Sequence, residues 1–378
     1  MSEILVNTIK KADGSGGLTV PAESGTLLSS TDGKVESAFT SQISGRRNMI
    51  LNGAMQVWQR SESATVSSDH HVAADRWKGR TYGGSGRYTM ALDTSDVPSG
   101  QSFTNAMKLT VTTADSSNTY SYAIQQNPEG YVFAPVRAGT SDAQQFTISF
   151  WAKSSVAGTY CWSARGPSGA ASYVFEYTLA ANTWTKVTHT VAAPTTTTPT
   201  WNYTTSQGVL IEWNLGRQPS QTTSTTEAWH NGNYVATANQ TDWIANSGAT
   251  FHLTGIQLEV GSVATPFEHR SYGEELAACQ RYLQKLNGGY MAGNGVGSSN
   301  INFGAPLTVS LRAQPTIPNT GYYTHRSGNV NHSANTVIVT SYGTGSNIIS
   351  LRQTGASVSD EVAYVITITN TLYLDAEI

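Results

Sequence analysis

The stretch SDHHVAADRW gathers four side chains of types that bind metal ions: Asp69, His70, His71 and Asp75. Adjacent residues of a β-strand point to opposite faces, so His70 and His71 are badly placed to share one ion if the stretch is extended. The sequence contains no HExxH motif, no paired CxxC and no EF-hand loop. We therefore expect no metal site of the transition-metal type. A structural Ca²⁺ held by loop carboxylates and carbonyl groups is the alternative, and the sequence does not locate it.

Catalytic side chains are equally hard to assemble from the sequence. The GxSxG turn of a serine hydrolase is absent, and the glycine-rich YGGSGRY lacks the GxxxxGKS/T pattern that cradles phosphate. Glu176 and Glu212 lie in the aromatic stretches VFEYT and LIEWN, and a pair of acids is what glycan hydrolysis requires. The simpler interpretation is that each acid faces outward from a strand. We predict no catalytic residues, no cofactor and no enzyme activity, with a surface-polysaccharide depolymerase as the alternative.

Two polar loops carry aromatic rings, and they are the candidate ligand-binding segments. Aromatic rings pack on the apolar faces of sugars, while amides and hydroxyls bind the sugar rims. The same combination suits protein recognition, and the competing interpretation is that the rings anchor long loops to the core. The candidate residues are Trp229, His230, Tyr234 and Trp243 in the first loop and Tyr322, Tyr323, His325 and Arg326 in the second.

The composition of the 378-residue chain favours a β-rich protein. Only 12% of the residues are charged, whereas Gly, Ser, Thr and Asn are abundant and there are 18 Tyr and 9 Trp. A net charge of −3 argues against a nucleic-acid partner. The N-terminus has no apolar core of signal-peptide length and no apolar run approaches ~20 residues, so we expect synthesis in a cytoplasm and no membrane insertion. Cys161 and Cys279 are expected to be free, buried thiols.

Hydrophobic periodicity divides the chain into four segments that would position these residues. Residues 1–46 hold short apolar pieces between Gly-Ser turns and are interpreted as an extended attachment or oligomerisation arm. Residues 47–270 show repeated two-residue alternation, which predicts an all-β jelly-roll or β-sandwich domain. Residues 271–288 are predicted to form a short linking helix, and residues 289–378 a small C-terminal β domain.

Local signals mark the ends of several elements. Gly255 lies where the apolar, inward-facing side chains change from odd to even positions in the sequence, which predicts a β-bulge. Ser271 and Glu274 have the spacing of a helix capping box, and Asn287 with the following glycine is the predicted helix end. The apolar face of this helix is expected to pack on the neighbouring sheet or on symmetry-related copies. Apolar side chains recur at even positions from 362 to 374, which predicts one long strand, or two strands broken near Asn370.

Several motifs together resemble a known family. NMILNGAMQVWQR, ADRW, TGIQLEVGSVATPFEHRSYGEELAACQRYLQK, LRAQPTI and LYLDAEI are similar to segments of tail fibre and minor structural proteins of tailed bacteriophages. In that family the first string opens a jelly-roll domain similar to carbohydrate-binding modules. By this resemblance residues 48–60 form the first core strand, with Met49, Leu51, Met55 and Val57 inward or bridging and a bend at 52–53. The opening SEILVNTIKKADG resembles the virion-anchoring start of similar fibres.

The resemblance implies a location and partners. It implies a homotrimer in the virion tail, made in a bacterial host and attached to other virion proteins through its N-terminal arm. The outer domains are then expected to bind a glycan or protein of the bacterial surface. A purely structural head or collar fibre, or a tail adaptor, is the further alternative, and no catalytic motif accompanies the resemblance.

Overall fold

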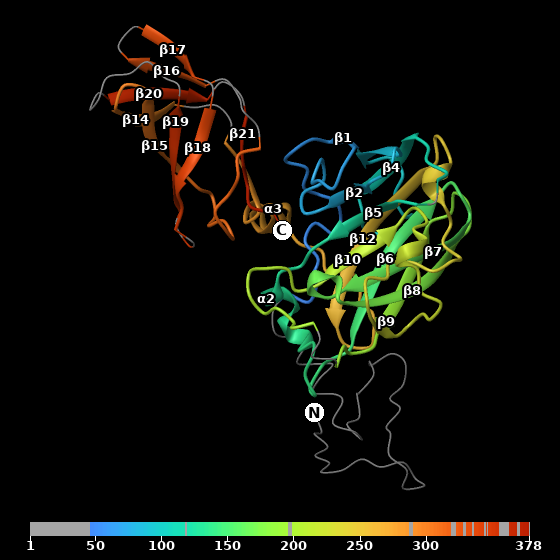
Figure 1. The fold of residues 1–378 in the computed structure, drawn as a ribbon. Coiled ribbons are helices and arrows are strands. Elements are labelled where there is room, and N and C mark those ends of the chain that lie inside the picture. The colour runs from blue at the N-terminus through green and yellow to red at the C-terminus, as the bar shows by residue number, and fades with distance from the viewer. Residues whose placement is uncertain are drawn as a thin grey trace, which may run out of the picture.

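The computed structural model describes residues 46–377 apart from 118, 196–198, 287–289, 319–322, 328–329, 335, 344, 346, 355–362 and 369–370. Within this part of the chain two six-stranded antiparallel sheets pack face to face as a sandwich (Figure 1). The predicted all-β class is thus confirmed. The predicted N-terminal arm lies outside the described residues.

The first sheet, called sheet A here, has the strand order β1-β3-β4-β12-β6-β9. Its long central strand β12 pairs with β4 on one side and β6 on the other, so residues 250–260 run through the middle of the sheet. The strands of sheet A are β1 (Ser63–Val66), β3 (Arg87–Asp93), β4 (Ala106–Thr113), β6 (Phe146–Ser154), β9 (Thr185–Val191) and β12 (Thr250–Val260).

The second sheet, called sheet B, has the order β11-β8-β7-β10-β5-β2. Aromatic side chains dominate its inner face, where the rings of Trp77 and Trp162 both contact that of Trp213, with ring centres 5.6 and 6.4 Å apart. Such edge-on ring contacts stabilise a core beyond the burial of area alone. The strands of sheet B are β2 (Lys78–Tyr82), β5 (Ser121–Gln126), β7 (Gly158–Arg165), β8 (Ala171–Leu179), β10 (Leu210–Asn214) and β11 (Trp229–Asn231).

Residues 48–60 are largely buried, but they do not form the predicted core strand. Asn52 and Met55 both have φ near +55°, which breaks an extended backbone, and the Met55 N–H donates to the Asn52 carbonyl. The bend expected at Asn52 is therefore present. Met55 and Val57 are fully buried, so the predicted inward direction of these side chains is confirmed although the strand is not.

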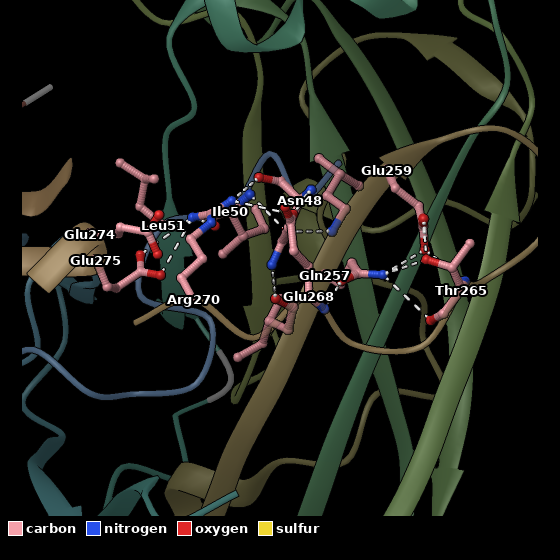
Figure 2. A network of polar contacts seen from close by, with 12 residues as sticks. Asn48, Ile50, Leu51, Gln257, Glu259, Thr265, Glu268, Arg270, Glu274 and Glu275 are labelled. Carbon is pink, nitrogen blue, oxygen red and sulfur yellow. Dashed lines mark hydrogen bonds and ion pairs between the residues drawn. The ribbon is translucent and has the colours of Figure 1, made fainter. Parts of the chain in front are cut away.

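Side chains satisfy the backbone of this irregular stretch and connect it to the end of the sandwich. Asn48 Nδ2 donates to the Ile256 carbonyl, while Asn48 Oδ1 accepts the N–H groups of Ile50 and Leu258 (Figure 2). The Asn48 N–H donates to Glu268, and Arg270 donates to the Asn48 carbonyl. The segment is thereby held against β12 without strand pairing.

The same network continues along residues 257–275. Gln257 Nε2 donates to Glu259 and to Thr265, while its Oε1 accepts the Glu268 N–H (Figure 2). Because most of these groups are buried and paired, they fix the chain path after β12. We call the set the closing network; its members are Asn48, Gln257, Glu259, Thr265, Glu268, Arg270 and Glu275.

The predicted bulge in β12 is confirmed. The register of β12 against β6 shifts between Thr254 and Gln257, and Gly255 has a φ of +62°. A Cβ atom at Gly255 would lie 2.5 Å from the Phe103 ring, so glycine meets both the backbone and the packing requirement.

The linking helix is shorter than predicted. Helix α3 (Tyr272–Gln280) begins with the predicted capping box between Ser271 and Glu274. It ends at Gln280 rather than near Asn287, because β13 (Leu283–Leu286) pairs with the distant β21 (Leu372–Asp375). Cys279 on this helix and Cys161 are both free and buried, as expected. No helix among the described residues is long and apolar enough to cross a bilayer.

The C-terminal region forms a further, separate sheet with its own apolar cluster. In the described residues this sheet has the order β17-β16-β20-β14-β15-β19-β18, drawn from orange to red in Figure 1. The run 362–374 forms two strands, β20 and β21, in different sheets, so the alternative with a break near residue 370 is correct. The remaining strands are β14 (Tyr290–Val296), β15 (Asn300–Pro306), β16 (Tyr323–Ser327), β17 (Val330–Ala334), β18 (Thr336–Ser341), β19 (Ile348–Thr354) and β20 (Ala363–Ile368).

A buried ion cluster attaches the segment after β21 to the sandwich. Glu377 forms ion pairs with Arg76 and Arg60, and Arg60 also pairs with Asp375 at 2.8 Å. Burial alone would raise the pKa of Glu377, but Arg76, His71 and Arg60 together lower it to about 2. The carboxylate is therefore charged at neutral pH and neutralised by the surrounding guanidinium groups.

Candidate functional site

The outer face of sheet B carries polar side chains that alternate with the aromatic residues of the core. Gln125, Glu212 and Ser163 lie in one row across β5, β10 and β7. The side chains of Trp213 and Trp162 face the core. Trp213 follows Glu212 on β10, and Trp162 precedes Ser163 on β7. The two-residue period of the strands therefore separates a polar outer row from an apolar inner row.

Glu212 is the centre of this outer face. Its side chain is fully buried, and its Oε2 accepts hydrogen bonds from Arg165 Nη2 at 2.6 Å and from Gln125 Nε2. Arg165 also donates through Nη1 to Asn233 Oδ1 at 2.7 Å. The carboxylate is thus paired with one guanidinium, which partly offsets the cost of removing both charges from water.

Several polar atoms on this face have no hydrogen-bond partner among the described residues. An unpaired buried donor or acceptor costs about 1–3 kcal/mol, so we expect buried water to bond to the five such atoms on this sheet face. These atoms are Arg80 Nε, Ser121 Oγ, Ser163 Oγ, Arg165 Nε and Glu212 Oε1.

Residues 217–240, called the cover segment here, are bonded to this face. Glu227 N–H donates to the Val174 carbonyl, and Cys161 N–H donates to Gln240 Oε1. Burial raises the pKa of the Cys161 thiol to about 11, so this cysteine is not a nucleophile at neutral pH. A pocket of about 240 Å³ is lined by the cover segment residues Arg217, Pro219, Thr222, Thr237 and Ala238.

Aromatic side chains lie on both edge strands of sheet B. On β2 the Tyr82 ring is 60% exposed, and the Arg80 guanidinium lies 5.4 Å from its centre. At the opposite edge, the rings of His230 and Tyr234 contact each other at 5.7 Å. Because β2 and β11 are the outermost strands of six, these edges are about 24 Å apart at ~4.8 Å per strand.

The structure separates the four residues predicted in the first aromatic loop. His230 pairs with Ser172 in the strand register and therefore faces the outer side of sheet B with Arg165. Tyr234 packs on the apolar cluster beneath the cover segment. Trp229 faces the other way, against the Tyr173 ring. Trp243 is fully buried in the core beside Tyr88, so it is not the surface residue that we expected.

The second predicted group is placed only in part. Tyr322 lies outside the described residues. Tyr323, His325 and Arg326 belong to β16, but their side chains are outside the described part of the chain. Their predicted role in ligand binding stays a prediction.

The two acids considered for glycan hydrolysis share the outer side of sheet B but serve different contacts. Glu176 accepts hydrogen bonds from Thr237 and Asn239 of the cover segment. Glu212 is bound by Arg165 and Gln125 instead. Because Cys161 and Val174 pack with Val235 and Ala236 on this face, an apolar cluster accompanies the acids rather than an open groove.

The residues of SDHHVAADRW do not converge on one point. His70 is exposed and bonds Ser68, whereas the half-buried His71 lies 3.6 Å from Glu377. Asp75 accepts hydrogen bonds from Gln59. A different group, Asp93, Asp96 and His252, brings its ligand atoms within 4.8 Å of one another on sheet A.

Sequence reasoning did not identify Tyr82, Arg165 or Gln125 as site residues. Arg165 carried a usable signal, since polar side chains recur at alternate positions of β7 between aromatic and aliphatic residues. Gln125 carried a weaker one, because Ala123 and Gln126 interrupt the alternation in β5. Tyr82 carried none, because its exposure depends on the position of β2 at the edge of the sheet.

No protein-family model and no curated protein sequence matches this chain. Several solved structures are similar in fold. TmCBM61 in complex with β-1,4-galactotriose matches with 11% identity and a TM-score of 0.29, over 57% of this chain and 100% of its own. The family 11 carbohydrate-binding module of Clostridium thermocellum, in complex with a mixed-linked tetrasaccharide, matches with 11% identity and a TM-score of 0.27, over 54% of this chain and 99% of its own. The CBM22-1 xylan-binding domain of Paenibacillus barcinonensis Xyn10C matches with 10% identity and a TM-score of 0.27, over 53% of this chain and 95% of its own.

Proposed function

We propose that this chain is a non-catalytic binding protein whose ligand is a glycan held along the edges of sheet B. The observation that carries the proposal is the exposed Tyr82 on β2, with the Arg80 guanidinium 5.4 Å from its ring centre. The ring packs on the apolar face of a sugar, and the guanidinium donates to the sugar hydroxyl groups.

The aromatic side chains at the two edges support the choice of a chain-like glycan. Tyr82 is exposed at β2, and His230 with Tyr234 lies at β11. Rings at both ends of a polar surface pack on the apolar faces of successive sugars. Because the edges are about 24 Å apart, a single sugar does not contact both, whereas an oligosaccharide does.

The arrangement of acids favours binding over hydrolysis. Glycoside hydrolysis needs two carboxyl groups flanking one bond, and Glu176 and Glu212 are each held by separate protein partners. We therefore propose no enzyme activity, and the depolymerase alternative predicts shortened polysaccharide chains on incubation with the purified protein.

We further propose, from the family resemblance of the sequence motifs, that the chain is a tail fibre or related virion protein of a tailed bacteriophage. In this proposal residues 1–46 attach to other virion proteins and three copies associate. Three linked sites raise the effective affinity for a bacterial surface without new contacts.

The glycan proposal is tested with purified full-length protein on an array of bacterial surface polysaccharides. Tyr82→Ala is expected to weaken binding about tenfold, because the ring stacks on a sugar. Tyr131→Ala is the matched control, since Tyr131 has the same 60% exposure but lies on α2 (Gly130–Phe133). Equal affinity of the two variants would remove the Tyr82 edge from the site, and no binding by the wild type would overturn the glycan proposal.

The virion proposal is tested separately. Light scattering should give three times the 40.4 kDa mass of one chain, and antibodies against the protein should label phage tails. Labelled virions together with no affinity for host cells would favour the purely structural fibre. A monomer in solution and unlabelled virions would overturn the virion role while leaving the glycan site untouched.

A further inference from the structure

Three metal-binding side chains converge on the outer face of sheet A, away from the site on sheet B. Asp93 ends β3, Asp96 follows in the next turn, and His252 lies on β12. His252 Nε2 is 3.4 Å from Asp93 Oδ2 and 3.8 Å from Asp96 Oδ2. The three ligand atoms all lie within 4.8 Å of one another.

The two separations from His252 fit a small tetrahedral ion. Zinc binds histidine nitrogen and carboxylate oxygen at about 2.0–2.2 Å, which places neighbouring ligand atoms of a tetrahedron about 3.3 Å apart. The distance from His252 to Asp93 matches this value, and that to Asp96 exceeds it by a few tenths of an ångström. A small rotation of the Asp96 side chain, which is 38% exposed, closes the difference.

Surrounding donors turn one oxygen of each carboxylate towards His252. Asp93 Oδ1 accepts the N–H and hydroxyl groups of Ser95 and the N–H of Asp96. Asp96 Oδ1 accepts Trp184 Nε1 at 2.9 Å. The Oδ2 atoms therefore face the histidine, and hydrogen bonds to the far oxygen are how proteins orient metal ligands.

His252 itself lacks a hydrogen-bond partner. Its residue is 3% exposed, and neither ring nitrogen has a hydrogen bond among the described residues. From this geometry we propose that Asp93, Asp96 and His252 form a zinc-binding site that fastens the turn after β3 to sheet A.

Lys153 is the group that competes with the ion. Its ammonium contacts Asp96 Oδ2, and both Lys153 and Lys108 are strand-register neighbours of His252. In the metal-free protein the ammonium neutralises Asp96. When zinc binds, the flexible side chain of Lys153 turns to solvent, so zinc and Lys153 exclude each other at Asp96.

The ligand set distinguishes zinc from calcium. Calcium takes six to eight oxygen ligands and does not favour imidazole, whereas one nitrogen and two carboxylates with an open fourth position suit zinc. Calcium is therefore the discriminating ion in the test.

The test uses the tag-free full-length chain, stripped with a chelator and titrated with zinc sulfate. We expect one zinc per chain and a rise in melting temperature of about 5–10 °C at a hundredfold excess over Kd. Asp96→Asn should abolish most of this rise. Lys153→Met should enlarge it, because the competing ammonium is gone; a merely structural role of Lys153 does not predict that result.

His70→Ala is the control, because it removes an exposed histidine of the kind that binds zinc loosely. It should leave the zinc-induced rise unchanged. The proposal is overturned if zinc does not raise the melting temperature, if Asp96→Asn responds as the wild type does, or if Lys153→Met loses the response. An equal rise with calcium overturns the choice of zinc. Because Asp96 lies in a partly exposed turn, its variant is expected to fold.

Discussion

Two buried polar networks in the same sandwich differ in how completely they are paired. In the closing network, both side-chain polar atoms of Asn48 and of Gln257 have partners. Only Arg270 Nε in the closing network is unpaired, whereas on the outer face of sheet B Glu212 Oε1, Arg165 Nε and Ser163 Oγ all lack a hydrogen-bond partner among the described residues. The first network is therefore the more completely paired, and it contributes more to folding.

The contrast teaches how to separate polar groups that stabilise the fold from those that contribute little when both are buried. Burial does not distinguish them, since Asn48 and Arg165 are both 5% exposed. The pairing of their atoms does. Substitutions of paired groups in the closing network should lower the stability strongly, and substitutions at unpaired atoms should lower it little.

The largest effect is expected for Asn48→Ala. It leaves the Ile50 and Leu258 N–H groups and the Ile256 carbonyl without their side-chain partner, which should lower the free energy of unfolding by about 4 kcal/mol. Urea unfolding measures the change. Asn246→Ala, which removes an exposed asparagine that also bonds backbone carbonyls, should cost less than about 1 kcal/mol. A similar loss in both variants would contradict the structural role of the closing network.

Glu377→Gln tests the ion cluster and its dependence on pH. The folded pKa of Glu377 is about 2, below its ordinary 4.5, so its charge should stabilise the wild type by about 3 kcal/mol at pH 7. This difference is fully present above pH 4.5 and is lost as the pH falls towards 2. Asp75, whose pKa is raised to about 6 mainly by burial, acts in the opposite direction, and the charge of Glu377 contributes a smaller part of that rise. A difference that does not change between pH 7 and pH 3 would contradict the assignment.

Gly255→Ala should disturb the bulge that positions Ile256 for Asn48. The left-handed φ of +62° and the approach to Phe103 should together cost about 2–3 kcal/mol. Gly248→Ala is the matched control, because Gly248 has a φ of +76° with no atom within 4 Å of the added Cβ. Thermal unfolding should show the smaller loss at Gly248, and equal losses would mean that Phe103 moves freely.

The smallest effect on stability is expected for Ser163→Ala. Because Ser163 Oγ has no partner among the described residues, its removal should change the free energy of unfolding by less than about 0.5 kcal/mol. A strong loss of stability would show that the hydroxyl is paired in the folded protein.

Features that depend on neighbouring residues could be predicted from the sequence. The capping box of α3 involves Ser271 and Glu274, three positions apart, and the bulge follows from the parity change around Gly255. The end of α3 could not be predicted, because Leu283 belongs to a strand that pairs with residues some 90 positions later. Local helical periodicity continues past Gln280, and the distant pairing overrides it.

The candidate site was predicted only in part, for a related reason. The aromatic loop sequence indicated His230 and Tyr234, yet it could not separate them from Trp243, which is a core residue. Glu212 was singled out as an acid, but its partner Arg165 depends on the register between β10 and β7. That register is a property of the assembled sheet rather than of either strand.

The closing network has a consequence for the order of events during synthesis. Asn48 and the Ile256 carbonyl that it binds are 208 positions apart. At about 5–20 residues per second, a ribosome needs roughly 10–40 s between these two residues. During that interval β12 is not yet available to cover the apolar stretch after Arg47. Chaperones or the strands already synthesised must then cover this stretch to prevent aggregation.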